Sequence, residues 1–250
     1  MDGASFYDDN EVFDTYQRSR QRAETPNDTI EKPVMMELIG AVHGTRILDL
    51  GCGDAAFGRE ALANGCASYV GLEGSQNMVA AARQTLAGTK GAVIHNTLEN
   101  WDYPTAAFDL VISRLVLHYI ENIDTLFANI HRSLVDKGQF VFSAEHPVIT
   151  SSDKGWQSGT QRQDWVVDNY FDTGERITTW MGGKVRKYHR TLEDYFRSAQ
   201  LAGFTIEQLR EGHPKREHFL TGETYQRRKR IPLFLMMSLR KAKIASVSTI

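Results

Sequence analysis

The stretch ILDLGCGDA at residues 47–55 decides the fold of this chain. Its first residues are mostly apolar and predict a buried strand, and two closely spaced glycines then turn the chain into a helix. Glycine has no Cβ and tolerates positive φ, so the backbone can pass close to a ligand that lies across the strand end. The pattern predicts a strand–turn–helix unit with a nucleotide-like ligand at its turn.

The alternation of strand and helix continues after this unit. Predicted strands cover SYVGLEG (68–74), AVIHNT (92–97), FDLVISRL (108–115), QFVFSAEH (139–146), FTIEQLRE (204–211) and IPLFLMMSL (231–239). Helices are predicted over 57–65, 75–88, 124–138 and 191–203, and a short connection joins the third and fourth strands. Apolar strands joined by helical crossovers indicate a doubly wound α/β fold with a mostly parallel, seven-stranded sheet. Pro232 stands at the tolerated start of the last strand.

Two regions depart from this rhythm. An apolar stripe at helical spacing predicts a helix over residues 28–42, at the end of a polar N-terminal stretch. The runs DWVVDNYF (164–171) and RITTWMGGKVRKYH (176–189) predict short strands in an insertion after the fifth strand. We therefore expect a single domain over 1–250, with a helical lid region at 1–42 and an inserted substrate cap at 148–190.

Composition bounds the function. Hydrophobic residues make up 41% and charged residues 24% of the chain, as expected of a protein that folds in water, and we expect no membrane span. The acidic start MDGASFYDDN lacks the positive flank and apolar run of a secretory signal, so we expect a cytoplasmic protein. Cys52 and Cys66 form no paired framework and no metal-type spacing. A net charge of −2 argues against nucleic acid as a partner, although a local basic patch remains open.

Glu73 is the second element of the ligand-binding pattern. It ends the second predicted strand, roughly 20 residues after the glycine turn, where such folds hold a ribose by its hydroxyl pair. The alternative is that Gly51 and Gly53 only shape a tight turn and that Glu73 is a solvated strand end. Both interpretations fit the pattern at this stage.

The motifs ILDLGCGDA, VGLEGSQNMVAAAR, FDLVISRLVLHYI and LVDKG before QFVFS, taken in this order, resemble those of class I methyltransferases that use S-adenosylmethionine (SAM). The resemblance covers residues 45–147 and extends more loosely to the C-terminal helix and strands. It is similar in particular to the small-molecule branch known as type 11 or UbiE-like. The resemblance implies a Rossmann-like methyltransferase domain with SAM as the cofactor and no metal.

The resemblance also implies roles for single residues. Gly51 and Gly53, with Cys52 between them, would line the methionine part of SAM, Asp49 would orient its amino-acid end, and Glu73 would hold the ribose. Further cofactor-binding positions are Gly74, Ser75 and Met78 beside the ribose or adenine, Leu98 and Glu99 on the adenine side, and Ser113 and Arg114 near the methionine amine. Tyr16, Arg18 and Arg20 resemble a lid in which the tyrosine covers the cofactor and an arginine meets its carboxylate. A solvated helix face explains these three equally well.

Two positions differ from the family pattern. Ala55 stands where a third glycine is common, which is a minor steric change, and Thr97 stands where an aspartate is common. The contact to the adenine amine would then come from Glu99 or from the backbone. A dinucleotide-dependent oxidoreductase is the main rival, but the glycine motif is shorter than GxGxxG and the later motifs do not match.

His118, Glu145 and His146 are the candidate catalytic residues, because they follow the fourth and fifth strands at the edge of the sheet where ligands bind. A general base helps when the acceptor is a phenol, a hydroxyl or a protonated nitrogen. Each candidate has a structural alternative: His118 as a packing residue, and Glu145 and His146 as a cap of the following helix or loop. Residues 188–190 could join the insertion to the core, and Arg190 could pair with Glu145.

The insertion is where we expect acceptor specificity. Its aromatic residues Trp156, Trp165, Tyr170, Phe171 and Trp180 could form an apolar wall for an aromatic acceptor, or a small local core. The basic run at 227–230 could bind phosphate or RNA, but such runs before a strand are usually solvated connections.

Three functions remain open from the sequence. The favoured one is methyl transfer to an oxygen or nitrogen of a small organic acceptor, aromatic acceptors included. The second is modification of tRNA, which requires an open basic face around the site. The third is a SAM-binding regulatory module without turnover.

Overall fold

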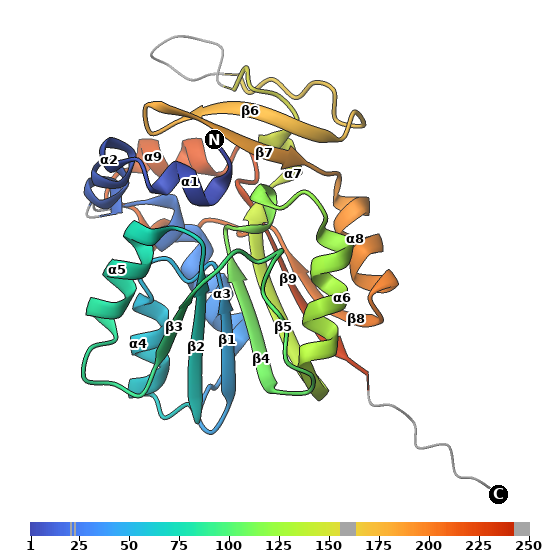
Figure 1. The fold of residues 1–250 in the computed structure, drawn as a ribbon. Helices are drawn as coiled ribbons and strands as arrows, with labels where there is room; N and C mark the ends of the chain where they lie inside the picture. Colours follow the sequence, from blue (N-terminus) through green and yellow to red (C-terminus); the bar gives the residue numbers. More distant parts are fainter. Residues whose placement is uncertain (21, 23, 156–163, 243–250) are drawn as a thin grey trace, which may run out of the picture.

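The computed structural model describes residues 1–20, 22, 24–155 and 164–242. Its main sheet has seven strands in the order β3-β2-β1-β4-β5-β9-β8 (Figure 1). The strands are β1 (Arg46–Leu50), β2 (Ser68–Glu73), β3 (Ala92–His95), β4 (Phe108–Arg114), β5 (Leu134–Glu145), β8 (Phe204–Arg210) and β9 (Phe234–Lys241). Strand β9 is antiparallel to both its neighbours, and the other pairs are parallel. The predicted doubly wound, mostly parallel fold is confirmed.

Helices cover both faces of this sheet (Figure 1). Helices α3 (Lys32–Ile39), α4 (Ala56–Ala63) and α5 (Gln76–Thr85) pack on one face, and α6 (Ile123–Ser133) and α8 (Leu192–Leu201) on the other. Successive residues of β1 point to opposite faces, so Leu48 and Leu50 enter the core with α6 and α8, whereas Ile47 packs with α3 and α4. Asp49 therefore shares the face of Ile47. Within the described residues, no helix has the length and apolar character needed to cross a membrane.

Two predicted boundaries shift. The helix predicted over 124–138 ends at Ser133, because Leu134 already pairs with Phe108 of β4 and begins β5. The last strand was predicted from residue 231, but β9 starts at Phe234, so Pro232 precedes the ladder in which it could not donate a hydrogen bond. Neither shift moves the carboxyl ends of the strands.

The helix predicted over 28–42 is divided. It begins as a single π-helical turn, η1 (Asn27–Glu31), continues as α3 and ends at Gly40, where φ is 69°. Glycine is favoured after a helix in this conformation because it carries no Cβ. The π-helical turn buries Glu31 completely, which matters for the site described below.

The N-terminal helices and the insertion lie together over the carboxyl ends of the central strands (Figure 1). Helices α1 (Gly3–Tyr7) and α2 (Asn10–Arg20) meet a hairpin of β6 (Gly174–Trp180) and β7 (Gly183–His189). Phe6 and Val12 pack against Val185 of β7, and the Arg186 N–H donates to the Met1 carbonyl at 2.9 Å. The remaining short elements are η2 (Leu117–Tyr119), α7 (Pro147–Thr150), η4 (Arg216–His218) and α9 (Gly222–Arg228).

Of the two runs predicted to form short strands in the insertion, one forms a hairpin and the prediction for the other is wrong. The hairpin β6–β7 occupies 174–189 as expected, but residues 164–171 form no strand beyond an isolated bridge at Trp165. A backbone bond from Val166 to the Gly155 carbonyl, 3.2 Å long, ties this segment to the turn before it. Among the described residues, no ladder continues from this bridge.

Candidate active site

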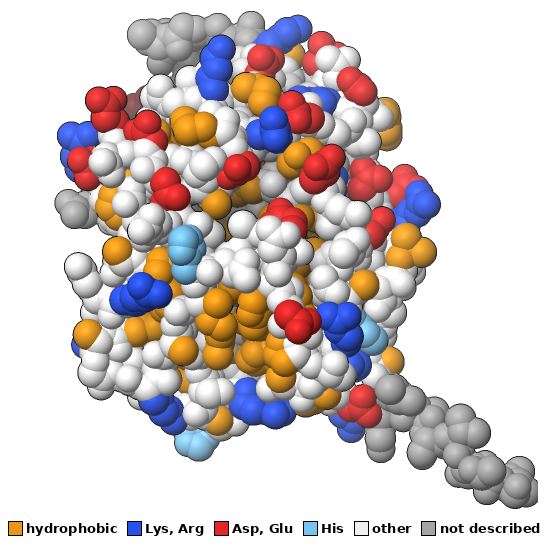
Figure 2. Space-filling model, in the orientation of Figure 1, with side chains coloured by type: hydrophobic (Ala, Val, Ile, Leu, Met, Phe, Trp, Pro, Cys, Tyr) orange, Lys and Arg blue, Asp and Glu red, His pale blue; other side chains and the backbone are white. Residues whose placement is uncertain are grey.

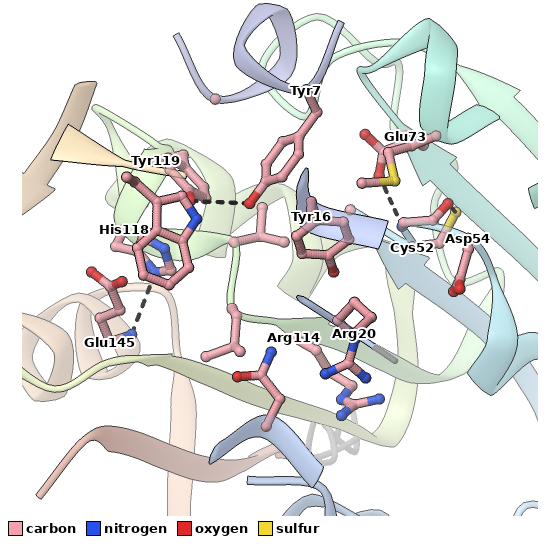
Figure 3. A pocket seen from close by; sticks show the side chains of 18 of the residues that line it. Tyr7, Tyr16, Arg20, Cys52, Asp54, Glu73, Arg114, His118, Tyr119 and Glu145 are labelled. Atoms are coloured by element: carbon pink, nitrogen blue, oxygen red, sulfur yellow. Dashed lines mark hydrogen bonds between the residues drawn. The ribbon is translucent and has the colours of Figure 1, made fainter. Parts of the chain in front are cut away.

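A cavity of about 1020 Å³ opens at the carboxyl ends of β1, β2, β4 and β5 and is also lined by residues of α1, α2 and β6 (Figure 3). Most predicted site residues line it: Tyr16, Arg20, Asp49, Gly51, Cys52, Gly53, Glu73, Gly74, Met78, Leu98, Glu99, Arg114, His118 and Glu145. Ser75, Ser113 and His146 do not. Residues that are far apart in the chain thus meet at one sheet edge, as the fold predicts.

The glycine turn after β1 needs its glycines for two reasons. Gly51 and Gly53 have φ values of 68° and 56°, and a Cβ on Gly51 would lie 2.4 Å from Val116 Cγ2. Ala55 also has a positive φ, 56°, at the position where the family commonly has glycine. That substitution was expected to be a minor steric change, but its cost lies in the backbone, since a left-handed conformation costs an L-residue about 1–2 kcal/mol.

Glu73 is held by the backbone around the turn. Its Oε2 accepts the Gly53 N–H and its Oε1 accepts the Ser75 N–H, both at 2.9 Å. Burial raises the pKa of Glu73, and these backbone hydrogen bonds partly offset the rise. An ionised carboxylate has about four lone-pair positions, so two remain for a diol. Glu73 is therefore not a solvated strand end: it is 8% exposed and faces the cavity.

Ser75 and Ser113 are placed beside the cavity and not on it. The Ser75 hydroxyl caps α5 by accepting the Met78 N–H at 3.2 Å, and it donates to Asp8 at 2.8 Å. Ser113 is fully buried in β4, and its Oγ has no hydrogen-bond partner among the described residues. Neither side chain therefore lines the cavity: Ser75 caps α5 and Ser113 packs inside the sheet.

Asp49 is buried in the sheet below the glycine turn. The Tyr69 hydroxyl donates to its Oδ2 at 2.7 Å. Burial raises the pKa of Asp49 to about 7, against the opposing effects of that hydrogen bond and of the Arg114 charge. A carboxyl group that titrates near neutrality and faces a cavity responds strongly to any cation bound there.

Arg114 turns its side chain toward Glu31. Its Nε donates to Glu31 Oε1 at 3.0 Å, its Nη2 donates to Oε2, and the Ser143 hydroxyl donates to Oε1 at 2.7 Å. Glu31 is fully buried in the π-helical turn. Glu31 could not be identified from the sequence, because no local pattern links residues 83 positions apart.

Tyr16 and Arg20 of α2 line the same end of the cavity. Arg20 pairs with Asp28 at 3.0 Å and also contacts Thr25. Tyr16 packs its ring edge-on against Tyr7, with centroids 5.2 Å apart. Burial raises the pKa of Tyr16, which marks it as an inward-facing side chain. The solvated-face alternative does not fit Tyr16.

At the other end of the cavity, His118 of η2 lies beside Glu145 at the end of β5 (Figure 3). The His118 Nδ1 accepts the Glu145 backbone N–H at 3.4 Å. Burial lowers the pKa of His118 to about 4, so the ring is neutral at pH 7. Burial would raise the pKa of Glu145, but the ammonium of Lys187, 2.6 Å away, holds it below its usual range. Lys187 was not singled out from the sequence.

His146 points away from the cavity. Its Nε2 lies 3.0 Å from Glu211, and its Nδ1 accepts the Val148 N–H at 3.1 Å, which caps α7. Both ring nitrogens are thus engaged elsewhere, and the helix-cap alternative describes this residue.

In the segment 188–190, Tyr188 and Arg190 join the insertion to the core, whereas His189 makes its contacts inside the insertion. His189 contacts Thr150 at 2.7 Å and the Tyr170 carbonyl at 2.9 Å. Arg190 donates to the backbone carbonyls of the loop 117–121, so its suggested pairing with Glu145 is wrong. Lys187, three residues earlier on β7, pairs with Glu145 instead.

The aromatic wall is only partly where it was expected. Trp165 and Trp180 line the cavity, whereas Phe171 is 87% exposed and Tyr170 packs against His189. Trp156 lies outside the described residues. Tyr7 and Tyr119 complete the wall, with their hydroxyls 3.4 Å apart.

The basic run at 227–230 begins at the end of helix α9, which includes residues 227 and 228. Arg228 lines the cavity, so the prediction that the run is only a solvated connection does not describe this residue.

The sheet order and the carboxylate held at the end of β2 define a Rossmann-like enzyme that binds a nucleoside-type cofactor across its sheet edge. The family model described as a methyltransferase domain matches residues 48–142. An uncharacterized protein of Haemophilus influenzae is 32% identical over 217 residues, which are 83% of this chain and 85% of that protein. The malonyl-[acyl-carrier protein] O-methyltransferase of Legionella pneumophila is 26% identical over 186 residues, which are 72% of this chain and 65% of that protein.

Solved structures of methyltransferases are also similar to this chain. An S-adenosylmethionine-dependent methyltransferase from Mesorhizobium loti is 34% identical, with a TM-score of 0.79 over 84% of this chain and 97% of that one. A methyltransferase of the same kind from Listeria monocytogenes is 28% identical, with a TM-score of 0.80 over 85% of this chain and 97% of that one. The chain belongs to the class I SAM-dependent methyltransferases, and its cofactor is SAM.

The residues present fit this cofactor. Glu73 retains lone pairs for the ribose, and the open glycine turn allows close approach. The Thr97 hydroxyl, in the cavity wall beside Leu98, is buried without a hydrogen-bond partner among the described residues. An orphaned hydroxyl in a cavity wall is a group that a bound ligand can satisfy.

Proposed function

We propose that this enzyme methylates an oxygen or nitrogen of a small organic acceptor, with aromatic acceptors among its substrates. The observation that carries the proposal is the single cavity that extends from Glu73 to Glu145 and His118. Its volume of about 1020 Å³ is at the upper end of the ~300–1,000 Å³ typical of ligand pockets, so it has room for a cofactor and a small acceptor together.

The residues divide the cavity by chemistry. Asp49, Gly51 and Glu73 would hold SAM, whose sulfonium supplies an activated methyl group. The rings of Tyr7, Tyr119 and Trp180 would position the acceptor at the opposite end. Orientation is the main contribution of the protein to such a reaction.

Helices α1 and α2 are proposed as a lid, and the hairpin β6–β7 as a cap over the acceptor. The contacts between Phe6, Val12 and Val185 support one closed roof over the cavity. A closed roof favours a small acceptor over an RNA. Figure 2 also supports this choice, because acidic and basic side chains are mixed around the upper part of the face it shows.

Glu145 is proposed as the proton acceptor, and His118 as a hydrogen-bond donor. A neutral ring whose Nδ1 accepts a hydrogen bond carries its proton on Nε2. SAM would supply the methyl group and would be released as the neutral thioether S-adenosylhomocysteine. Glu145 would take the proton of the acceptor and pass it to water, while His118 would hold the acceptor by a hydrogen bond.

The test is a screen of phenols, catechols, aromatic amines and carboxylic acids with SAM, scored by S-adenosylhomocysteine formed. We expect turnover of a phenol, catechol or amine, and a fall of about 10²- to 10⁴-fold in kcat for Glu145→Gln with unchanged SAM affinity. His146→Gln is the matched control, since its side chain lies outside the cavity. Turnover with a folded RNA and with none of these small acceptors would contradict the proposal.

A further inference from the structure

Lys187 is the least expected charged residue near the cavity. Its side chain is 6% exposed, and its ammonium lies 2.6 Å from Glu145 Oε1. The same ammonium stands over the rings of Tyr119 and Trp180, at 5.8 Å and 5.4 Å from their centroids. Lysine is rarely buried unless it is paired, so this arrangement is a built feature of the inserted hairpin.

The two members of the Glu145–Lys187 ion pair differ in their access to the cavity. Glu145 and Trp180 line the cavity, whereas Lys187 does not, so the ammonium supports the carboxylate from behind. Lys187 occupies Oε1, and none of the described residues is bonded to Oε2. What the acceptor meets is therefore a carboxylate oxygen with open lone pairs.

The neighbours of this oxygen add a donor. His118 lines the cavity next to Glu145, with Nδ1 turned to the backbone and Nε2 without a partner among the described residues. The titratable and charged groups that face Glu145 come from four elements. They are Lys187 on β7, His118 and Tyr119 on η2, Tyr7 on α1 and Tyr195 on α8.

We propose that Lys187 is a positioning residue that holds Glu145 as an open carboxylate, and that this end of the cavity selects acceptors bearing an N–H or O–H group over carboxylates. The selection rests on the proposed function, because it assigns the substrate class of the same site. An amine, amide or hydroxyl donates to Glu145 Oε2, and a neighbouring carbonyl or ether oxygen accepts from His118. A carboxylate has no proton to donate there and is repelled by Glu145.

The probes are benzamidine, benzamide and benzoate, three compounds of one shape that differ in charge and in donors. Each is titrated into the wild-type protein saturated with S-adenosylhomocysteine. Benzamidine and benzamide are expected to bind at least about tenfold more tightly than benzoate, since a hydrogen bond to a charged group is worth that much. Tighter binding of benzoate would overturn the assignment.

Lys187→Met tests the positioning role, and Lys184→Met is its control, because Lys184 is exposed on the same hairpin. Without the ammonium, the buried Glu145 carboxyl should take up a proton near neutral pH. Benzamidine binding by Lys187→Met should then be weakened about tenfold at pH 6.5 and recover toward pH 8.5, whereas Lys184→Met and the wild type stay flat. A flat profile in Lys187→Met would refute the role of Lys187.

The double variant Glu145→Gln with Lys187→Met guards against a folding defect. It removes both charges, so it avoids the unpaired buried carboxylate of the single variant and should remain folded. It is expected to lose the preference for benzamidine at every pH. Persistence of that preference would contradict the proposal.

These outcomes separate the two proposals. Turnover of carboxylic acids alone would reject the selection by Glu145 and leave small-molecule O-methylation standing. A preference for benzamidine without turnover of any small acceptor would reject the proposed function but would still support binding of N–H and O–H groups by Glu145.

Discussion

Asp49→Asn is the substitution for which the structure gives the clearest magnitude. Burial raises the pKa of Asp49 from 3.8 to about 7 in the folded protein. At about 1.4 kcal/mol per pKa unit, ionising this group in the native state costs about 4 kcal/mol. The native state binds more protons than the unfolded state between about pH 4 and pH 7, so the free energy of unfolding falls as the pH rises through this range.

Binding of SAM should lower the free-energy cost of ionising Asp49. Its ammonium and sulfonium charges favour the ionised form of a carboxyl group in the cavity wall. SAM affinity should therefore rise as the pH increases toward 7, by at most about tenfold per pH unit. Asp49→Asn removes this titration, so its SAM affinity should be lower and should depend less on pH than that of the wild type.

Two measurements check this account. Urea unfolding of the cofactor-free protein between pH 4.5 and 8 should show that the free energy of unfolding falls more steeply with pH in the wild type than in Asp49→Asn. Calorimetric titration with SAM over the same range should show the opposite trend. Asp136→Asn, which changes an exposed carboxylate at the start of β5, is the control and should follow the wild type. Parallel pH profiles of wild type and Asp49→Asn in both assays would refute the reasoning.

Two further predictions concern the cofactor end. Glu73→Gln should weaken SAM and S-adenosylhomocysteine by about 10- to 100-fold in calorimetry, with no heat from NAD, because it removes a charged acceptor for the ribose. Unchanged affinity would reduce Glu73 to a structural role at the turn. Gly51→Ala should lower the free energy of unfolding by about 2–4 kcal/mol, since its Cβ would meet Val116 at 2.4 Å and φ is 68°. Gly88→Ala, with φ of 76° and no atom within 4 Å, isolates the backbone cost of about 1–2 kcal/mol, and equal losses would show that close packing is not the cause.

Much of the fold could be predicted because its signals are local. Buried parallel strands read as apolar runs, and the glycine turn and Glu73 are placed by their spacing along the chain. The boundaries that shifted are those where pairing across the sheet decides. Leu134 leaves its helix because it pairs with Phe108, and residues 164–171 form only an isolated bridge, which no ladder among the described residues continues.

Some residues of the site could likewise be predicted from local sequence, whereas others depend on tertiary packing. The sequence by itself determined the cofactor edge, because each strand delivers its terminal residue to the same side of a parallel sheet. Only the tertiary structure decided the charge pairs: Glu31 with Arg114, and Glu145 with Lys187 from a hairpin 42 residues away. It also turned His146 toward Glu211 and out of the cavity, although His146 is adjacent to Glu145 in the chain. The periodicity that predicts strands and helices depends on residues that are neighbours in the chain. The partner of a buried charge depends on how distant segments pack, so no local pattern predicts it.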